Sequence, residues 1–545
     1  MMMFAPIRHG CTAMNTPMSQ RATARRGSVV VVVVWAVAVA AVLVSATQIV
    51  TFRQAVVGRE TLARVQARWA ARAGMEQMVA IMEFHLENAD PDDPMAVVRD
   101  MEEHATGTTA TGSWDIRHFL DGLEWAGPLD EGAKLNINVA TSVQLTNIPN
   151  MTPDVVDAIV DWRDADDNVQ GLGAESDYYS NRSLGYKPRN GNFRSFAELE
   201  LVAGAWPQYV RGEDWNLNGR LDPNENDGNK SFPNDKPDGK LDGGWSKFLT
   251  ATSVQSPMSL SGEEKLPLKG ADPESLTKRL GIDADQAKAL ATYGNQANAK
   301  PEALIATPLS QLSTPAGAGG TGGTGSSGGG SGSTGGKTGG GTSGGGSTGG
   351  GRGTGGGSSG GMSVSTGGGA QSVSGGAAGG RGATSAGGSS SAGGGSSGRS
   401  SSGRSSGGTG GASAVANLTN AQLRAVLRET TADDFTKPVP GRMNINTVPD
   451  SVLKEVLEID PRLADAIIAR RRAKPEGITS LADLSDMSGI NPTVLTQLAT
   501  QFDVTSSVYT VTSRGRAAST SAEVEIEAVI DKSQLPAKII SYREQ

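Results

Sequence analysis

The feature that most constrains this chain is an uncharged stretch that runs from Ser28 to Val50. At a rise of about 1.5 Å per residue, a helix of this length covers roughly 34 Å, more than the roughly 30 Å of hydrocarbon in a bilayer. A secretory signal peptide usually has a shorter apolar region, of about 7 to 15 residues. We therefore predict a retained single-pass membrane anchor. Arginines on both sides of the stretch leave its orientation undecided.

Beyond the anchor, apolar residues continue at the helical spacings of three and four. They predict one long helix whose first half lies in the membrane and whose second half is amphipathic. The residues expected on the apolar face of the second half are Leu62, Val65, Trp69, Met75, Met78 and Met82.

A basic leader precedes the anchor and ends in Arg26 and Gly27, directly before Ser28. This arrangement resembles the start of type IV prepilins and pseudopilins, in which a dedicated prepilin peptidase cuts after the glycine. The resemblance implies a processing site at Gly27 and Ser28. Most members carry Glu at the fifth mature position, where this chain has Val32, and loss of this glutamate is characteristic of K-type minor pseudopilins. An ordinary bitopic anchor is the alternative for this segment alone.

Composition divides the rest of the chain unevenly. Of the 74 glycines, 46 lie between Gly317 and Gly411, in a Gly/Ser/Thr tract that cannot form a packed core and is expected to be a flexible tether. The formal net charge of −8 comprises +4 from the leader, +5 from the tract and −17 from the remainder. An acidic body argues against a chain that grips phosphate backbones and suits hard cations. The single cysteine, Cys11, lies in the leader, so the mature chain would have no disulfide.

A helix-hairpin-helix pattern follows the first predicted strand, residues 112–119. Residues 143–148 predict a short helix, Asn150 to Thr152 a tight hairpin, and Pro153 the start of a second helix. In DNA-binding hairpins the turn is Gly-hydrophobic-Gly, because bare backbone amides must approach a phosphate closely. Here Asn150, Met151 and Thr152 replace it. We therefore predict a packing role for this hairpin rather than DNA binding.

Further motifs follow the segment DEGAKLNIN in a fixed order: residues 161–167, 174–179, 186–190 and 196–204. The series closely resembles the core signature of the K-type minor pseudopilin of type II secretion systems, over about residues 28–253 and again from residue 441 to the end. The resemblance implies a structural role at the tip of a periplasmic pseudopilus that drives protein export across the outer membrane. It also implies I-type and J-type minor pseudopilins as partners, and a bacterial inner-membrane location with the C-terminal part in the periplasm.

Between Asp214 and Glu225 the sequence DWNLNGRLDPNE matches a 12-residue calcium loop position by position. Gly219 makes the sharp turn at position 6, and the ligand positions supply six oxygens from one short segment. We predict bound calcium, with a polar turn that holds no ion as the alternative. The predicted ligands are Asp214, Asn216, Asn218, Arg220 through its carbonyl, Asp222 and Glu225.

A weaker copy of this loop begins at Asn234 and has Trp245 where the closing carboxylate is needed. It is interpreted equally as a second calcium site or as a solvated turn. Its candidate ligands are Asn234, Asp238, Lys240 and Asp242. A further acidic set in residues 164–177 is interpreted as a solvated loop.

The part after the tract repeats the earlier design, which indicates internal duplication. Asn444, Ile445 and Asn446 repeat residues 136–138, and a further hairpin candidate contains Gly489. The basic residues 470–472 keep an alternative function open, that of a membrane-tethered helix-hairpin-helix receptor for DNA. Two alternating runs, residues 508–513 and 524–530, predict a C-terminal β-hairpin.

No enzyme constellation is found, and the four histidines show no metal-ligand spacing. The predicted class is α+β, with a pilin-like N-terminal helix packed on an antiparallel sheet, and a large helical insertion that contains helix-hairpin-helix-like (SAM-like) repeats and the disordered Gly/Ser tract. The resemblance implies that strands near Trp114 and the C-terminal hairpin form the sheet. The predicted divisions are 1–27 (leader), 28–50 (membrane half of the helix), 51–130 (rest of the helix and first strands), 131–250 (first helix-hairpin-helix-like region with the calcium loops), 251–314 (helical segment), 315–414 (linker), 415–504 (second helix-hairpin-helix-like region) and 505–545 (C-terminal hairpin).

Overall fold

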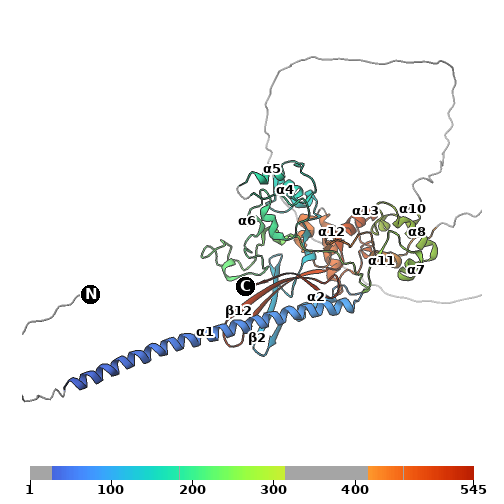
Figure 1. Cartoon of the computed structure of the whole chain (residues 1–545). Coiled ribbons are helices and arrows are strands. Elements are labelled where there is room, and N and C mark those ends of the chain that lie inside the picture. The colour runs from blue at the N-terminus through green and yellow to red at the C-terminus, as the bar shows by residue number, and fades with distance from the viewer. Residues whose placement is uncertain (1–26, 183–184, 313–414, 458) are drawn as a thin grey trace, which may run out of the picture. The chain divides into compact units, whose positions relative to one another are not determined.

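The computed structural model describes residues 27–182, 185–312, 415–457 and 459–545, and only the backbone of Gly27 and Ser28. The leader up to residue 26 and the Gly/Ser/Thr tract therefore lie outside the described residues. The described residues belong to one unit, which the chain builds from the segments on both sides of the tract (Figure 1).

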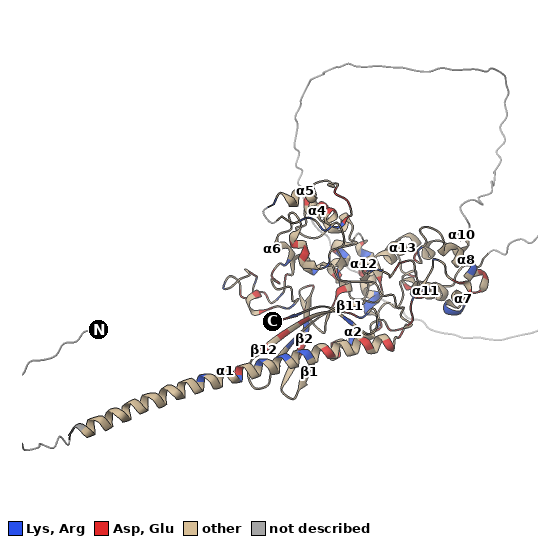
Figure 2. Ribbon diagram, in the orientation of Figure 1, with Lys and Arg blue, Asp and Glu red and all other residues tan. Residues whose placement is uncertain are grey.

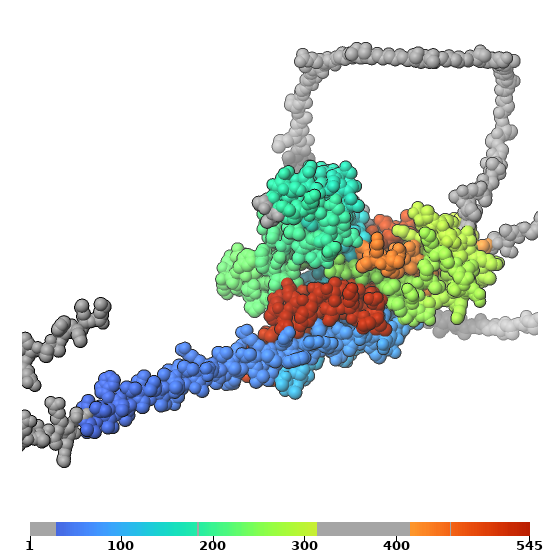
Figure 3. All heavy atoms as spheres, in the orientation of Figure 1, coloured from blue at the N-terminus to red at the C-terminus, as the bar shows by residue number. Residues whose placement is uncertain are grey.

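A single helix, α1, runs from Gly27 to Glu87, which confirms the prediction of one long helix. Residues 29–62 are all exposed. Figure 2 shows that the N-terminal half of α1 lacks the charged side chains that its C-terminal half carries, and Figure 3 shows that the N-terminal half projects from the rest of the unit. By length and composition this helix can cross a membrane.

The buried face of the second half of α1 differs from the predicted one. Leu62, Val65 and Trp69 are 58%, 45% and 60% exposed. Alanines are buried in their place, because the sheet approaches α1 too closely for larger side chains: a Cβ atom on Gly515 would lie 2.0 Å from the carbonyl oxygen of Ala67. The prediction is therefore wrong for these three residues and confirmed for the methionines. The buried residues of this face include Ala63, Ala67, Ala70, Ala71, Met75, Met78 and Met82.

The sheet that packs on α1 is antiparallel and seven-stranded, in the order β1-β2-β11-β12-β13, with β3 paired to β2 and β4 to β11. It joins strands from both ends of the chain, since Ser513 pairs with Ile116 and Gly515 with Trp114. The predicted strand near Trp114 and the predicted hairpin are confirmed, whereas β13 was not predicted. The strands are β1 Thr106–Thr109, β2 Gly112–Leu120, β3 Leu123–Ala126, β4 Leu129–Asp130, β11 Val508–Ala517, β12 Glu523–Asp531 and β13 Lys538–Glu544.

The core between α1 and the sheet contains the three methionines together with Ile116, Val511 and Ile526. Helix α2, Ala96–Glu103, closes one end of this core with Val97 and Met101. A helix on one face of an antiparallel sheet is the predicted α+β arrangement.

Two helical lobes are inserted between β4 and β11. The first follows β4 and the second precedes β11, and the two lobes share one hydrophobic core. The first lobe contains η1 Glu131–Ala133, β5 Leu135–Asn136, α3 Ser142–Thr146, α4 Pro153–Arg163, α5 Ser176–Ser180, η2 Phe196–Leu201, α6 Pro207–Val210, η3 Pro223–Glu225, η4 Gly244–Lys247 and β6 Leu249–Thr250. The second lobe contains β9 Met443–Asn444, η5 Val452–Val456, α12 Pro461–Arg472, η6 Leu481–Leu484, α13 Pro492–Gln501 and β10 Phe502–Asp503.

The two lobes are structural copies. Each is closed by a short parallel pair, β5 with β6 and β9 with β10. In the first lobe Asn138 bonds the backbone N–H and C=O of Phe193, and in the second Asn446 does the same with Ile478. The predicted internal duplication is confirmed by these matching contacts.

Both copies also use an arginine at the end of their second helix. Arg163 donates to the carbonyl oxygens of Ile137 and Ala140. Arg471 donates to the equivalent oxygens of Ile445 and Val448, at 3.0 and 2.6 Å. These carbonyls lie in the turn that follows the first strand of each lobe, so each arginine fixes that turn.

A smaller helical cluster is formed by the segments that precede and follow the tract in the sequence. It has its own core, which contains Leu276, Leu290, Leu309 and Val426. Ser310, which precedes the tract, donates a hydrogen bond from its Oγ to Oδ1 of Asn417, which follows the tract, at 3.3 Å. The cluster contains β7 Leu266–Pro267, α7 Pro273–Leu280, α8 Ala284–Gly294, α9 Ala303–Ala306, α10 Leu309–Leu312, α11 Asn420–Glu429 and β8 Thr430–Thr431, and β7 pairs with β8.

Candidate functional site

The predicted calcium loop, Asp214 to Glu225, lies against the central sheet. The backbone N–H of Phe119 in β2 donates to the carbonyl oxygen of Gly219 at 2.7 Å. Thr512 Oγ1 in β11 donates to the carbonyl oxygen of Asn218 at 2.9 Å. The loop therefore connects the first helical lobe to two strands of the sheet.

Inside the loop, carboxylate oxygens point inward and are held by backbone amides. Asp214 accepts from the N–H groups of Asn218 and Gly219, both at 3.0 Å. Glu225 accepts from the N–H groups of Trp215 at 3.0 Å and Asp222 at 3.1 Å. Gly219 has φ +66°, which the sharp turn requires. The loop backbone thus orders the carboxylates of Asp214 and Glu225.

Two of these carboxylates are buried as well as close to one another. Burial is the first cause that raises the pKa of Asp214 to about 6. Burial likewise raises the pKa of Glu225 to about 7, and the nearby Asp214 and Asp222 carboxylates raise it further. A cation favours the ionised form of its ligands, and six oxygen donors on one short loop are what calcium requires. The residues therefore fit a calcium ion.

Two residues that sequence analysis missed complete the surroundings of the loop. Arg514 in β11 bridges Asp222, at 2.6 Å, and Glu525 in β12, at 2.8 Å. Asn218 Nδ2 also donates to Glu525 Oε1 at 2.8 Å. Alternation along β11 and β12 predicts which face of the sheet Arg514 and Glu525 occupy. No local sequence pattern, however, links these two residues to the loop at Asp214 to Glu225, which lies some 300 residues earlier in the chain.

Arg220 contributes differently from the other ligand positions. Its side chain is buried and pairs with Asp115 in β2 at 2.9 Å. The predicted calcium ligand at this position is the backbone carbonyl of Arg220, so its side chain can attach the loop to the sheet at the same time.

The second, weaker loop gathers no buried oxygen set. Its candidate ligands Asn234, Asp238, Lys240 and Asp242 are all exposed. The Asp238 carboxylate accepts from Lys240 N at 2.9 Å, and that of Asp242 from Gly244 N at 3.1 Å. These are local turn contacts, and they favour the solvated turn over the second calcium site.

The first hairpin, Asn150 to Thr152, is packed against the protein. Asn150 has φ +63°, Met151 is buried, and Trp245 Nε1 donates to the carbonyl oxygen of Pro149 at 2.9 Å. The backbone N–H of Met151 is already used, because it donates to the carbonyl oxygen of Ile148 at 3.1 Å. The contacts agree with the predicted packing role.

The hairpin of the second lobe carries a negative charge where a phosphate would bind. Asp460 caps α12 by accepting from Arg462 N at 2.8 Å. Of the basic residues 470–472, Arg471 is used inside the lobe and Arg472 pairs with Asp450 at 2.8 Å. Arg470 pairs with Asp486 at 3.5 Å. The helix start therefore repels an anion, and all three arginines are engaged.

The first lobe matches a known protein family. A model described as "Type II secretion system (T2SS), protein K" matches residues 135–212. Residues 135–212 belong to the protein K family. The predicted resemblance to K-type minor pseudopilins is thereby confirmed for this lobe, and the apolar N-terminal helix is suited by length and composition to cross a membrane. A helix-hairpin-helix motif model matches residues 441–503, which is the second copy of the protein K lobe.

The crystal structure of the GspK–GspI–GspJ complex from the type 2 secretion system of enterotoxigenic Escherichia coli contains a chain similar to this one, with 10% sequence identity and a TM-score of 0.36. The match covers 90% of this chain and 99% of that one. No curated protein matched the chain.

Proposed function

We propose that this chain is a minor pseudopilin that caps the tip of a periplasmic pseudopilus and acts there as a structural component of protein export across the outer membrane. The observation that carries the proposal is the protein K lobe inserted into a sheet that packs on the long helix α1. Val32 supports the tip position, because a subunit at the tip has no neighbour above it to use a glutamate at this place. The proposal assigns the chain no catalytic step.

We place the anchor in the bacterial inner membrane and the sheet and lobes in the periplasm. Processing by a prepilin peptidase after Gly27 tests the family role directly. Mass and N-terminal sequence of the chain extracted from its own membranes should give a mature protein that begins at Ser28. An intact leader would refute the proposal and favour an ordinary tethered protein.

The partners proposed from the family resemblance are the I-type and J-type minor pseudopilins. The exposed apolar stripe Leu62, Val65 and Trp69 on α1 offers a surface for packing against another helix, because these side chains are between 45% and 60% exposed. Replacing Trp69 with Glu should abolish co-purification with these partners, whereas replacing the exposed Arg64 of the same helix segment with Gln, which lowers the net charge by the same one unit, should not. Equal partner recovery in both variants would contradict this surface.

We further propose that the loop from Asp214 to Glu225 binds calcium and holds the first lobe on the sheet. Its contacts with β2, β11 and β12 support a structural clip rather than a sensor that opens. Calcium loops of extracellular proteins have dissociation constants of about 0.1 to 1 mM. Calcium should therefore raise the thermal midpoint of the detergent-solubilised chain, and Glu225→Gln should remove most of this effect.

The DNA-receptor alternative predicts salt-dependent binding of duplex DNA. The capping carboxylate of Asp460 and the buried Met151 of the first hairpin speak against it. Retention of duplex DNA by the full chain at low salt, lost on replacing Arg470, would favour that alternative.

A further inference from the structure

The part of α1 that directly follows the apolar stretch is basic and exposed. Residues 51–59 contain two arginines, Arg53 and Arg59, and the first acidic residue after Ser28 is Glu60. Both arginines are exposed. Figure 2 shows that the charged side chains of α1 begin with a basic one beyond the uncharged half of the helix. The helix therefore presents only positive charge at the level where it would leave a membrane.

These two arginines differ from the three that follow them in α1. Neither Arg53 nor Arg59 pairs with a carboxylate among the described residues. The three later arginines do, and their ion pairs are Arg64 with Glu60 at 3.3 Å, Arg68 with Glu544 at 3.0 Å and Arg72 with Glu76 at 3.3 Å. The two guanidinium groups nearest to the apolar stretch are thus the ones left for an anion outside the protein.

Their distance from the apolar stretch places them at the depth of lipid headgroups. Arg53 lies three residues beyond Val50, about 4.5 Å along the helix axis, and Arg59 lies nine residues beyond it, about 13.5 Å. Long side chains of a helix lean over the preceding turn, here towards the membrane, which brings them back by about 5.4 Å. Each headgroup layer is about 5 to 7 Å thick. Arg53 thus lies within this layer and Arg59 reaches its outer edge, whereas Arg64 begins about 21 Å beyond Val50 and does not.

Exposed apolar side chains lie between the two arginines on the surface of the helix. At about 100° per residue, Phe52 and Val56 fall on the face between Arg59 and Arg53. Phe52 is 72% exposed and Val56 is 49% exposed. An aromatic side chain beside arginines is typical of the level where a helix meets lipid headgroups, because the ring contacts acyl chains and the charges stay in the polar layer.

We propose that Arg53 and Arg59 bind the phosphate groups of anionic phospholipids in the leaflet from which α1 emerges. The inference rests on the proposed membrane anchor and holds for either orientation of the helix. A guanidinium group donates paired hydrogen bonds to phosphate oxygens, which favours this contact. The two contacts fix the depth of the anchor in the bilayer.

The rest of the chain does not supply this attraction. The formal net charge is −8, so the protein as a whole is repelled by anionic lipids. The sheet packs on α1 from Ala63 onwards, about 20 Å beyond Val50. This separation from the headgroups exceeds the Debye length of about 8 Å at physiological salt, so the acidic body hardly opposes the two arginines.

Native mass spectrometry of the full chain in detergent tests the proposal, with phosphatidylglycerol and phosphatidylcholine of the same acyl chains as the added lipids. The wild-type chain should retain the anionic lipid in preference. Arg53→Gln combined with Arg59→Gln should lower this preference about 25-fold, from about fivefold for each arginine near an anionic surface. Arg64→Gln combined with Arg72→Gln removes the same two charges beyond the headgroup layer and should leave the preference unchanged. The basic leader is the same in all these chains, so the comparison isolates α1.

An unchanged preference after replacing Arg53 and Arg59 would overturn the proposal, and so would an equal loss in the control variant. Hydrogen exchange in vesicles gives a second measurement. Peptides from residues 51–59 should exchange more slowly in phosphatidylglycerol than in phosphatidylcholine, and the variant that lacks both arginines should lose this difference. A difference that persists in the variant would also overturn the proposal.

Flotation of the same vesicles separates failure of the anchor from failure of this inference. A chain that floats with neither lipid would refute the anchor and the inference together. A chain that floats with both lipids, yet shows no preference between them, would refute the inference alone.

Discussion

The contact between α1 and the sheet can be tested with glycine-to-alanine substitutions. A Cβ on Gly515 would lie 2.0 Å from Ala67 O and 2.4 Å from Ala71 N, both backbone atoms of α1 that cannot rotate away. Nothing lies within 4 Å of a Cβ on Gly58, which belongs to the exposed part of the same helix. The same chemical change therefore has opposite expected effects at the two positions.

The magnitudes follow from these contacts. Overpacking a close interface costs about 1 to 3 kcal/mol. Separating helix and strand also lengthens the bond from Ser513 Oγ to Ala71 O, now 2.8 Å, which is worth about 1 kcal/mol. Gly515→Ala should thus lower the free energy of unfolding by about 2 to 4 kcal/mol. Gly58→Ala should raise helix stability by about 0.5 to 1 kcal/mol, because alanine loses less backbone entropy.

Hydrogen exchange of the detergent-solubilised full chain, read by mass spectrometry, resolves the local effect. Peptides from β11 should lose protection in Gly515→Ala, whereas peptides from the helical lobes should change less. Gly58→Ala should leave β11 unchanged. Wild-type protection of β11 in Gly515→Ala would refute the close approach of helix and sheet.

Three further predictions concern other parts of the chain. Adding about 10 mM calcium should stabilise the chain by about 1 to 3 kcal/mol through the loop site, for dissociation constants of about 0.1 to 1 mM, and most of this gain should be missing in Glu225→Gln when thermal midpoints are compared. Burial lowers the pKa of His118 to about 4 from its ordinary 6.5, so the unfolded chain takes up the proton first and stability falls as the pH drops from 6.5 towards 4. The loss is about 2 kcal/mol at pH 5, and urea titrations at pH 5 and 7 should show a weaker pH dependence in His118→Asn. Arg471→Met should cost about 3 kcal/mol, because two carbonyls lose a charged donor; Arg163→Met is its matched counterpart in the first lobe, and an unchanged urea midpoint for both would contradict the shared role.

Local signals predicted much of this structure from sequence. Proline at the first turn located the start of α4 at Pro153, and the repeated Asn-Ile-Asn identified the two copies of the lobe. The twelve positions from Asp214 to Glu225 predict a calcium loop, because the expected ligands lie close to one another in the chain. Each of these features depends on residues close in sequence.

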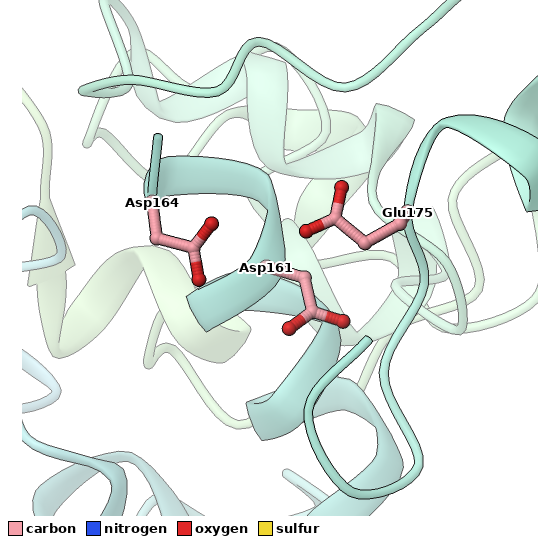
Figure 4. Close-up of side chains that lie close together, drawn as sticks. All are labelled: Asp161, Asp164 and Glu175. Atoms are coloured by element: carbon pink, nitrogen blue, oxygen red, sulfur yellow. The ribbon is translucent and has the colours of Figure 1, made fainter. Parts of the chain in front are cut away.

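Features that depend on distant residues were missed. The buried face of α1 contains alanines rather than Leu62 and Trp69, because Gly515, far along the chain, determines how closely the sheet approaches. The acidic residues of 164–177 were interpreted as a solvated loop, yet Glu175 is buried against Asp161 of the preceding helix (Figure 4). Charge alone predicts exposure, and only the tertiary contact shows that these carboxylates lie inside.

The helical cluster formed by the two flanks of the tract affects how freely the length of the tract can change during evolution. Its two flanks are fastened to each other, since Gln286 in α8 donates to the carbonyl oxygens of Ala416 and Asn417, and Leu309 shares a core with Val426. For a flexible loop with fixed ends, each doubling of length costs only about 0.6 kcal/mol of closure entropy. From the composition of residues 313–414 we expect insertions and deletions there to cost little folding free energy, and we expect relatives to vary most in length at this position.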